Sequence, residues 1–303
     1  MEFLHVSLGR ALYALTWLLG RLPLAGQRWL GARAAGAVLA LNRRSARIAR
    51  RNLEIIRPEW TPAQREAEVG RILRATGSNA LETLRIWTRS RADNLALVRE
   101  VHGESLIAEA LAHKRGMILA APHFGNWELL IEFMAARGPF SLVYRVPEKR
   151  FGDIFLRLAR SGENVLLVPA ESNAMRPLVR ALKNGETVGI TPDQQPKLGG
   201  GEFAPFFGRQ ALTLSLIPKL AARSGAPVLF AWAEPCAGGF TIHIEAGHPD
   251  IAHADLLIAT AAMNTQVEKI ARRDLAQYQW TYKRFSKRPP GSGESNPYKP
   301  DCY

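Results

Sequence analysis

The stretch GMILAAPHFGNWE at residues 116–128 decides the fold of this chain. Residues 117–121 are apolar and have the length of a buried strand, and an apolar stretch of helical length begins near Glu128. Further apolar runs alternate with helical stretches along the chain. We expect strands at residues 140–144, 165–168, 188–191 and 228–233, and helices at residues 173–183, 212–224 and 256–276. Strands that alternate with helices indicate an α/β sheet.

The segments on either side of this unit differ from it. Residues 46–89 carry apolar side chains at helical spacing, with Thr61-Pro62 as a helix start, and are expected to be helical. Residues 289–303 are rich in Pro, Gly and Ser and are expected to be loose or laid over the surface. We therefore divide the chain into an N-terminal helical segment (1–45), an α/β domain (46–290) and a tail (291–303).

Composition limits the possible partners. The 303 residues are 47% hydrophobic, enough to bury a full core, and the net charge is +13. This charge favours an anionic partner such as nucleic acid, phospholipid headgroups or an acidic carrier protein. Two cysteines, Cys236 and Cys302, are too few for a disulfide scaffold, and this indicates a reducing compartment.

The N-terminal segment has the composition of a membrane-contacting region. Nine arginines and no acidic residue lie between positions 10 and 51, and Trp17 and Trp29 lie among them. This pattern suits the headgroup boundary of a bilayer. The apolar runs at 11–20 and 34–41 are each shorter than the roughly 20 residues of a spanning helix. A helix packed on the domain and a tilted span remain alternatives, and no cleavage site predicts a signal peptide.

The polar residues of the opening stretch form a candidate catalytic pair. On one continuous helix His123 and Glu128 would point about 140° apart, but at a strand-to-helix turn they can meet. If Asn126 caps the helix, Glu128 falls in its first turn, where an ionised carboxylate is favoured. His123 would then act as a general base on a hydroxyl group, with Glu128 orienting the ring. The structural alternative is a histidine that merely ends a strand.

These residues resemble the His-x4-Asp/Glu motif of the lysophospholipid acyltransferase superfamily, specifically the bacterial lipid A (lauroyl/myristoyl) acyltransferases. Other segments are similar to the same family and follow in the same order. They are residues 46–58, YR at 144–145, GITPDQ at 189–194, PFFG at 205–208 with Thr213, and QYQWTYKRFSKRP at 277–289. The resemblance covers roughly residues 40–290 and implies a glycerolipid acyltransferase-like mixed sheet flanked by helices.

The resemblance implies O-acyl transfer from acyl carrier protein, or less often acyl-CoA, to a hydroxyl of a lipid A precursor at the cytoplasmic face of the bacterial inner membrane. It implies no cofactor, no metal and no nucleic acid. The expected catalytic residues are His123 and Glu128. The expected substrate-binding residues are Asn126, Arg145, Arg160, Asp193 and Gln194. Arg160 is the expected donor to the oxyanion, with Arg157 as the alternative, and Arg145 is expected to contact phosphate or the acyl site.

Departures from the family pattern bear on the acceptor. Leu275-Ala276 and Tyr282 stand where the family commonly has Pro-Glu and His, and residues 147–150 lack its Asn-rich form. The same chemistry on an ornithine lipid or glycolipid therefore stays open, as do a hydrolase and a non-enzymatic basic binding protein. His243, His248 and His253 do not have the spacing of a metal site, and Trp280, Arg284 and Phe285 are interpreted as core and surface residues. No Gly-x-Ser-x-Gly motif suggests a serine hydrolase.

Overall fold

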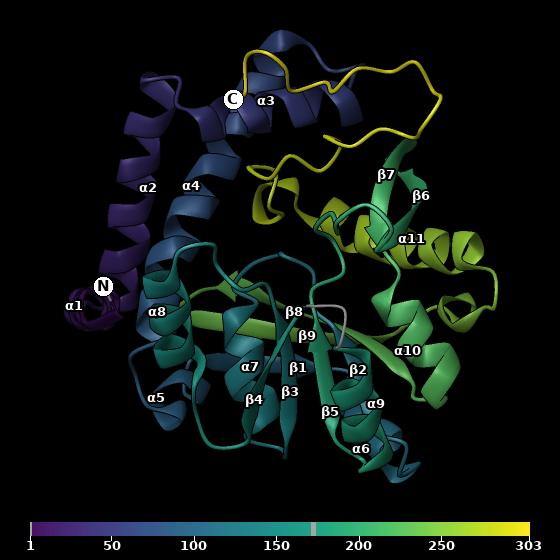
Figure 1. Ribbon diagram of the computed structural model, residues 1–303. Helices are drawn as coiled ribbons and strands as arrows, with labels where there is room; N and C mark the ends of the chain where they lie inside the picture. Colours follow the sequence, from purple (N-terminus) through teal and green to yellow (C-terminus); the bar gives the residue numbers. More distant parts are fainter. Residues whose placement is uncertain (1, 171–173) are drawn as a thin grey trace.

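The computed structural model of the protein describes residues 2–170 and 174–303, and Figure 1 shows how its elements are arranged. In this part of the chain seven strands form one sheet in the order β1-β9-β8-β2-β5-β3-β4. Neighbouring strands run parallel except β8 and β9, which are antiparallel. The strands are β1 (Val98–His102), β2 (Met117–Ala120), β3 (Phe140–Tyr144), β4 (Val165–Pro169), β5 (Thr187–Ile190), β8 (Val228–Cys236) and β9 (Gly239–Ala246).

Helices cover both faces of this sheet, which is why its central strands are apolar throughout. In β2, Met117 and Leu119 belong to one buried cluster with side chains of α6 and α7. Ile118 and Ala120 belong to a second cluster with side chains of α3, α4, α9, α10 and α11. The helices of this part are α5 (Arg91–Leu95), α6 (Ser105–Ala112), α7 (Glu128–Ala135), α8 (Arg150–Arg160), α9 (Met175–Lys183), α10 (Leu216–Ser224) and α11 (Leu256–Arg273). The predicted α/β fold with a mixed sheet flanked by helices is confirmed.

The N-terminal helical section consists of α1 (Glu2–Leu19), α2 (Leu24–Ala40), α3 (Arg44–Ile56) and α4 (Pro62–Ile86), and the short α5 follows it before β1. Helix α1 packs against α8, and α2 runs along α4 (Figure 1). The two backbones of α2 and α4 nearly touch, because a Cβ atom on Gly31 would lie 2.3 Å from the carbonyl oxygen of Gly77. Among the described residues, no helix combines the length and the apolar character that crossing a bilayer requires.

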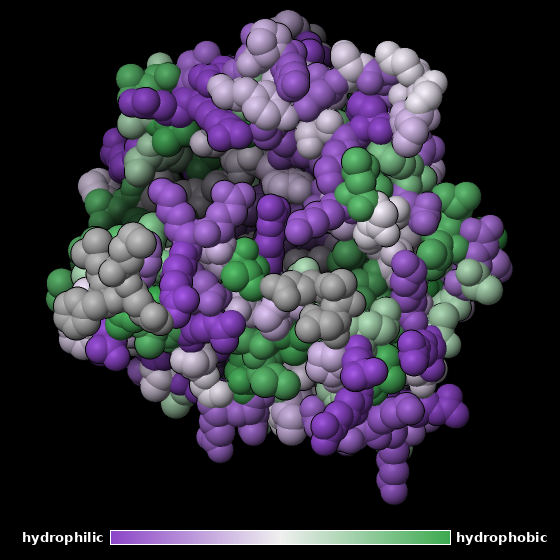
Figure 2. Space-filling model, in the orientation of Figure 1, coloured by the Kyte–Doolittle hydropathy of each residue, from purple (hydrophilic) through white to green (hydrophobic). Residues whose placement is uncertain are grey.

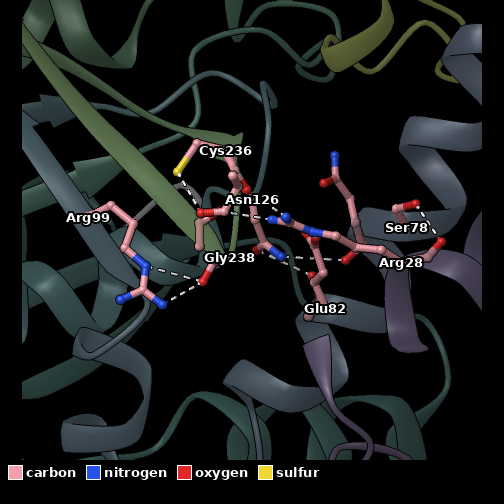
Figure 3. Close-up of polar contacts among 11 residues, drawn as sticks. Arg28, Ser78, Glu82, Arg99, Asn126, Cys236 and Gly238 are labelled. Carbon is pink, nitrogen blue, oxygen red and sulfur yellow. Dashed lines mark hydrogen bonds and ion pairs between the residues drawn. The ribbon is translucent and has the colours of Figure 1, made fainter. Parts of the chain in front are cut away.

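A buried ion pair attaches this helical section to the sheet, as Figure 3 shows. Arg28 of α2 pairs with Glu82 of α4, whose side chain is 1% exposed. The remaining Arg28 nitrogens donate to the carbonyl oxygens of Cys236 (2.7 Å) and Gly239 (2.8 Å), at the turn between β8 and β9. Since a buried carboxylate is costly without a partner, the pair fixes α2 and α4 together on the end of this hairpin.

The chain after α11 turns back over the helical section (Figure 1). A short 3-10 helix (Leu275–Gln277) leads into residues 278–288, which we call the closing segment. The tail beyond it lies on α3, where Arg44, Arg47 and Arg51 donate to carbonyl oxygens of the tail. Tyr298 is 1% exposed, so part of the tail belongs to the core. The boundaries at residues 45 and 290 stay predictions.

Several expected elements differ in their bounds. The helix expected at 212–224 is wrong in its first part, because residues 212–214 end strand β7 (Arg209–Leu214), which pairs with β6 (Gly201–Phe206), and α10 begins only at Leu216. The helix expected from Asn173 begins at Met175, and Asn173 lies outside the described residues. Helix α11 ends at Arg273, and the 3-10 helix Pro249–Ala252 precedes it.

Candidate active site

The candidate site lies at the carboxyl ends of three neighbouring strands. His123 follows β2, Asp193 follows β5 and Arg145 follows β3, and these strands adjoin one another in the order β2-β5-β3. The crevice at this edge is where parallel α/β sheets commonly bind ligands. Figure 2 shows a hollow between this edge and the helical section, with hydrophilic side chains along its rim.

The turn that carries His123 is held by backbone contacts on both sides. Gly125 has φ of 57°, a conformation that side chains rarely adopt, and a Cβ atom there would lie 2.0 Å from the carbonyl oxygen of Ala233. Its N–H donates to the carbonyl of Gln277 (3.0 Å), and the N–H of Gln279 donates to the carbonyl of His123 (3.0 Å). The turn therefore joins β8 to the closing segment and has little freedom to move.

Asp193 is the carboxylate that contacts the His123 ring. Its Oδ1 lies 2.8 Å from Nδ1 of His123, and its Oδ2 accepts the backbone N–H of the same histidine at 2.8 Å. The Asp193 side chain is 2% exposed. Burial raises its pKa, but the charge and hydrogen bonds of His123 and the charge of Arg284 outweigh burial, so the pKa lies below its ordinary value. An ionised Asp193 only accepts hydrogen bonds, so Nδ1 carries the ring proton and Nε2 is left as the basic nitrogen.

Two glutamines lie beside that basic nitrogen. The amide nitrogen of Gln194 is 3.2 Å from Nε2 of His123 and donates to Oε1 of Gln279 at 3.1 Å. The His123 side chain is 12% exposed, and Nε2, as the unprotonated nitrogen, accepts the Gln194 amide N–H. A hydroxyl that donates to Nε2 therefore has to replace the hydrogen bond from Gln194. Gln194, expected in the substrate site, thus lies against the ring.

Glu128 binds other groups than His123, and the expectation that it orients the ring is wrong in this structure. It accepts hydrogen bonds from Nε of Arg160 (3.1 and 3.2 Å), Nη2 of Arg160 (2.5 Å) and the indole N–H of Trp87 (2.9 Å). Its side chain is 5% exposed. Sequence proximity gives the wrong carboxylate as the partner of His123. Trp127 lies between His123 and the group that Glu128 binds, whereas Asp193 follows the neighbouring strand β5 and reaches the ring directly.

Trp127 lies between His123 and Arg160 and contacts both side chains. Its ring packs edge-on against the His123 ring, with centroids 5.5 Å apart, and the Arg160 guanidinium lies 4.9 Å from its centroid. Arg160 uses Nε and Nη2 on Glu128, and Nη1 has no hydrogen-bond partner within the described part of the chain. A held arginine with one free nitrogen is a suitable donor to a developing negative charge.

The remaining predicted site residues lie as follows. Asn126 is buried but does not cap α7, whose N-cap residue is Trp127, and the cap prediction is wrong. The Asn126 side chain instead faces α4, where Thr83 Oγ1 lies 3.4 Å from its Oδ1. Arg157 pairs with Asp153 at 2.9 Å on the same helix, and Arg160 alone of the two contacts Glu128.

Arg145 lies near one other cation, Lys287. Burial is the largest influence on two neighbouring groups: it raises the pKa of Tyr282 and lowers the pKa of Lys287. The positive charge of Arg145 acts to lower both pKa values, but the pKa of Tyr282 stays above its ordinary value. Lys287 donates to the carbonyl of Pro196 at 2.5 Å, and no ion pair joins either cation to a carboxylate among the described residues. Uncompensated positive charge beside the closing segment favours an anionic ligand.

Sequence reasoning missed Trp87 and Gln279 as parts of this site and assigned Arg284 to the core or surface. Arg284 is 2% exposed and donates to the Leu212 carbonyl (2.7 Å) and to Thr213 Oγ1 (3.0 Å), so the core assignment matches its position. Its charge also helps to keep Asp193 ionised. No local pattern could have indicated these contacts, because they join segments far apart in the chain.

Comparison with known proteins gives a consistent result. The profile of the bacterial lipid A biosynthesis acyltransferases matches residues 2–287. The chain is 30% identical over 307 residues to the lipid A biosynthesis palmitoleoyltransferase of Escherichia coli (strain K12), covering 98% of this chain and 97% of that protein. It is 28% identical over 278 residues to the lauroyltransferase of the same strain (91% and 90%), and 25% identical over 282 residues to the myristoyltransferase (88% and 81%).

The match extends over nearly the whole chain, and the relatives that it aligns with are all named as acyltransferases of lipid A biosynthesis. The resemblance inferred from the residue motifs is thereby confirmed, and so is the prediction of an acyltransferase. We conclude that this chain belongs to the bacterial lipid A biosynthesis acyltransferase family.

Proposed function

We propose that the protein transfers a fatty acyl chain from the thioester of acyl carrier protein, or of CoA, to a hydroxyl of a lipid A precursor, with His123 as the general base. The observation that carries this proposal is the contact of His123 Nδ1 with the buried Asp193 carboxylate, which leaves Nε2 as the basic nitrogen beside the Gln194 amide. Family membership supplies the reaction class and the acceptor type.

The chemistry needs one base and one oxyanion donor. Nε2 of His123 removes the proton of the acceptor hydroxyl as its oxygen attacks the thioester carbonyl carbon. The tetrahedral intermediate collapses, the C–S bond breaks, and the proton on Nε2 passes to the departing sulfur. Asp193 stabilises the imidazolium that exists between these two proton transfers, since the negative charge lies 2.8 Å from Nδ1.

Arg160 is the proposed donor to the carbonyl oxygen. Glu128 holds its Nε and Nη2 from one side, and the Trp127 ring lies beneath its plane, so Nη1 is the nitrogen available to a ligand. In this proposal Glu128 is a positioning residue that acts through Arg160. Orientation of the His123 ring, which nearness in sequence predicts for Glu128, belongs to Asp193 in this proposal.

The acceptor is a membrane lipid, and helices α1 and α2 are the proposed contact with the bilayer. They carry the exposed side chains of Leu15 (54%), Leu18 (62%) and Trp29 (58%). Arg21 lies over the ring of Trp17 at 4.1 Å and Arg33 over that of Trp29 at 5.4 Å. Apolar side chains bordered by arginines suit the headgroup layer of an anionic leaflet, which we take to be the cytoplasmic face of the inner membrane. The net charge of +13 also suits an acidic carrier protein.

The test is transfer of a labelled acyl chain from acyl carrier protein to Kdo-lipid A precursors by detergent-solubilised protein. We expect His123→Ala to lose a factor on the order of 10² or more in rate. Glu128→Gln should lose activity because Arg160 is no longer held in place. Arg160→Met should lose about as much activity as the double variant Glu128→Gln/Arg160→Met, because the two residues act together. Transfer to a different membrane lipid would reject the acceptor, and full activity of His123→Ala would reject the mechanism.

A further inference from the structure

A pocket lies between the helical section and the closing segment. Its volume is about 540 Å³, within the range of small-ligand sites. It is lined by side chains of α3, α4 and the closing segment, namely Arg44, Ser45, Ile48, Thr76, Thr281, Tyr282, Lys283 and Ser286. Five of these carry a hydroxyl group, two carry a positive charge, and none is a carboxylate.

The two cations of the pocket have no acidic partner. Nε of Arg44 donates to the carbonyl oxygen of Cys302 at 3.1 Å, and the ammonium of Lys283 lies 3.2 Å from the centre of the Tyr303 ring. Among the described residues, no aspartate or glutamate is within ion-pair distance of either group. Lys283 also forms a side-chain hydrogen bond with Tyr303, and its charge helps to lower the pKa of that phenol. Neither cation is paired with a carboxylate side chain, so an anion would offer each of them a stronger charge-assisted contact.

The pocket is connected to the candidate active site through Tyr282. The hydroxyl of Tyr282 accepts the backbone N–H of Gln195 at 2.9 Å, and the preceding residue, Gln194, contacts Nε2 of His123. The buried Asn52 of α3 fixes the same segment by donating to the carbonyl of Tyr282 at 2.9 Å. A ligand bound in the pocket thus contacts the closing segment, which also holds Gln194 beside His123.

We propose that this pocket binds the phosphorylated sugar headgroup of the acceptor lipid. The inference rests on the proposed function and adds a site that holds the acceptor. Phosphate matches the positive charges of Arg44 and Lys283 in the lining, and hydroxyl side chains match the hydroxyls of a sugar. The thioester donor also contains a phosphate, in its phosphopantetheine arm, but that arm is a linear chain with few hydroxyls for this lining to bind.

Steady-state transfer kinetics test the proposal with Arg44→Met, Lys283→Met and the double variant. Loss of one charge-assisted contact costs about 1.5–3 kcal/mol, so the acceptor KM should rise about 10-fold or more in each variant. The value of kcat and the donor KM should stay within about threefold of wild type. Arg43→Met, which removes the same charge one residue earlier and outside the lining, should change neither.

A binding measurement separates this proposal from the proposed function. Glucosamine 1-phosphate should raise the Tm of the wild-type protein more than glucosamine does, and the difference should disappear in the double variant but persist in Arg43→Met. If wild type transfers no acyl chain, this measurement still tests the pocket. An unchanged acceptor KM together with an unchanged Tm response would overturn the proposal, and a rise of the donor KM instead would assign the pocket to the donor. If the double variant is too unstable to assay, Lys283→Met alone and the charge-retaining Lys283→Arg give the same comparison.

Discussion

Replacing Asp193 by asparagine tests which carboxylate prepares His123. Asp193 makes two contacts of 2.8 Å with His123, one to Nδ1 and one to the backbone N–H. In Asp193→Asn the amide oxygen can keep the backbone contact, and its NH2 group then faces Nδ1. A donor at that place forces the ring proton onto Nε2, so the nitrogen that should accept the substrate proton is already protonated.

The expected loss follows from that change of tautomer. General-base catalysis contributes about 10²–10⁴ in rate, and a wrong tautomer removes most of it. We therefore expect kcat to fall by about 10²–10⁴, equal to about 2.7–5.4 kcal/mol of transition-state stabilisation, with the acceptor KM changed little. Labelled acyl transfer at saturating donor gives both constants, and urea unfolding shows that the variant is folded.

Asp153→Asn is the matched control, because Asp153 binds Tyr144 and Arg157 and does not contact His123. It should keep kcat within about threefold of wild type. A folded Asp193→Asn protein with wild-type kcat, beside an inactive Glu128→Gln protein, would refute this reasoning. Glu128 would then be the residue that orients the base.

Three further predictions concern stability and membrane contact. Gly31→Ala should lower the free energy of unfolding by about 1–3 kcal/mol, because the new methyl group meets the backbone of α4, whereas Gly36→Ala, with nothing within 4 Å, should not lower it; urea unfolding compares the two. Burial raises the pKa of Tyr298, so above about pH 10 the folded state keeps a phenol proton that the unfolded state loses. The free energy of unfolding should therefore fall by about 1.4 kcal/mol per pH unit above pH 10 on account of this one group. Tyr298→Phe should remove that part of the slope, and an equal slope in both proteins between pH 10 and 11 would contradict the assignment. Serine at both Trp17 and Trp29 should weaken sedimentation with anionic vesicles, and unchanged binding would exclude this face as the contact.

The sequence predicted the sheet better than the partners within the site. Apolar runs located the strands β2, β3, β4, β5 and β8, because buried parallel strands are apolar on both faces. Strand β9 was missed, since its residues alternate between buried and half-buried positions. Residues 212–214 were placed in a helix because a short apolar run does not distinguish a strand from a helix.

In the site, His123 and Asp193 were both predicted, but their contact was not. It depends on β2 and β5 being neighbours in the sheet, and strand order is not encoded in any local pattern. Nearness in sequence favours Glu128 as the partner of His123. Its actual partners, Arg160 and Trp87, come from α8 and from the end of α4, and only the folded chain brings them together.

The contact of Asn52 with the closing segment has a consequence for biosynthesis. Its amide donates to the carbonyls of Trp280 and Tyr282, residues separated from it by 228 and 230 positions. The wall beside His123 therefore cannot form until the ribosome has delivered almost all of the described chain. Nascent chains that end before residue 280 should be inactive even when the sheet has folded, so a growing chain that already touches the membrane should not acylate lipids before its synthesis is nearly finished.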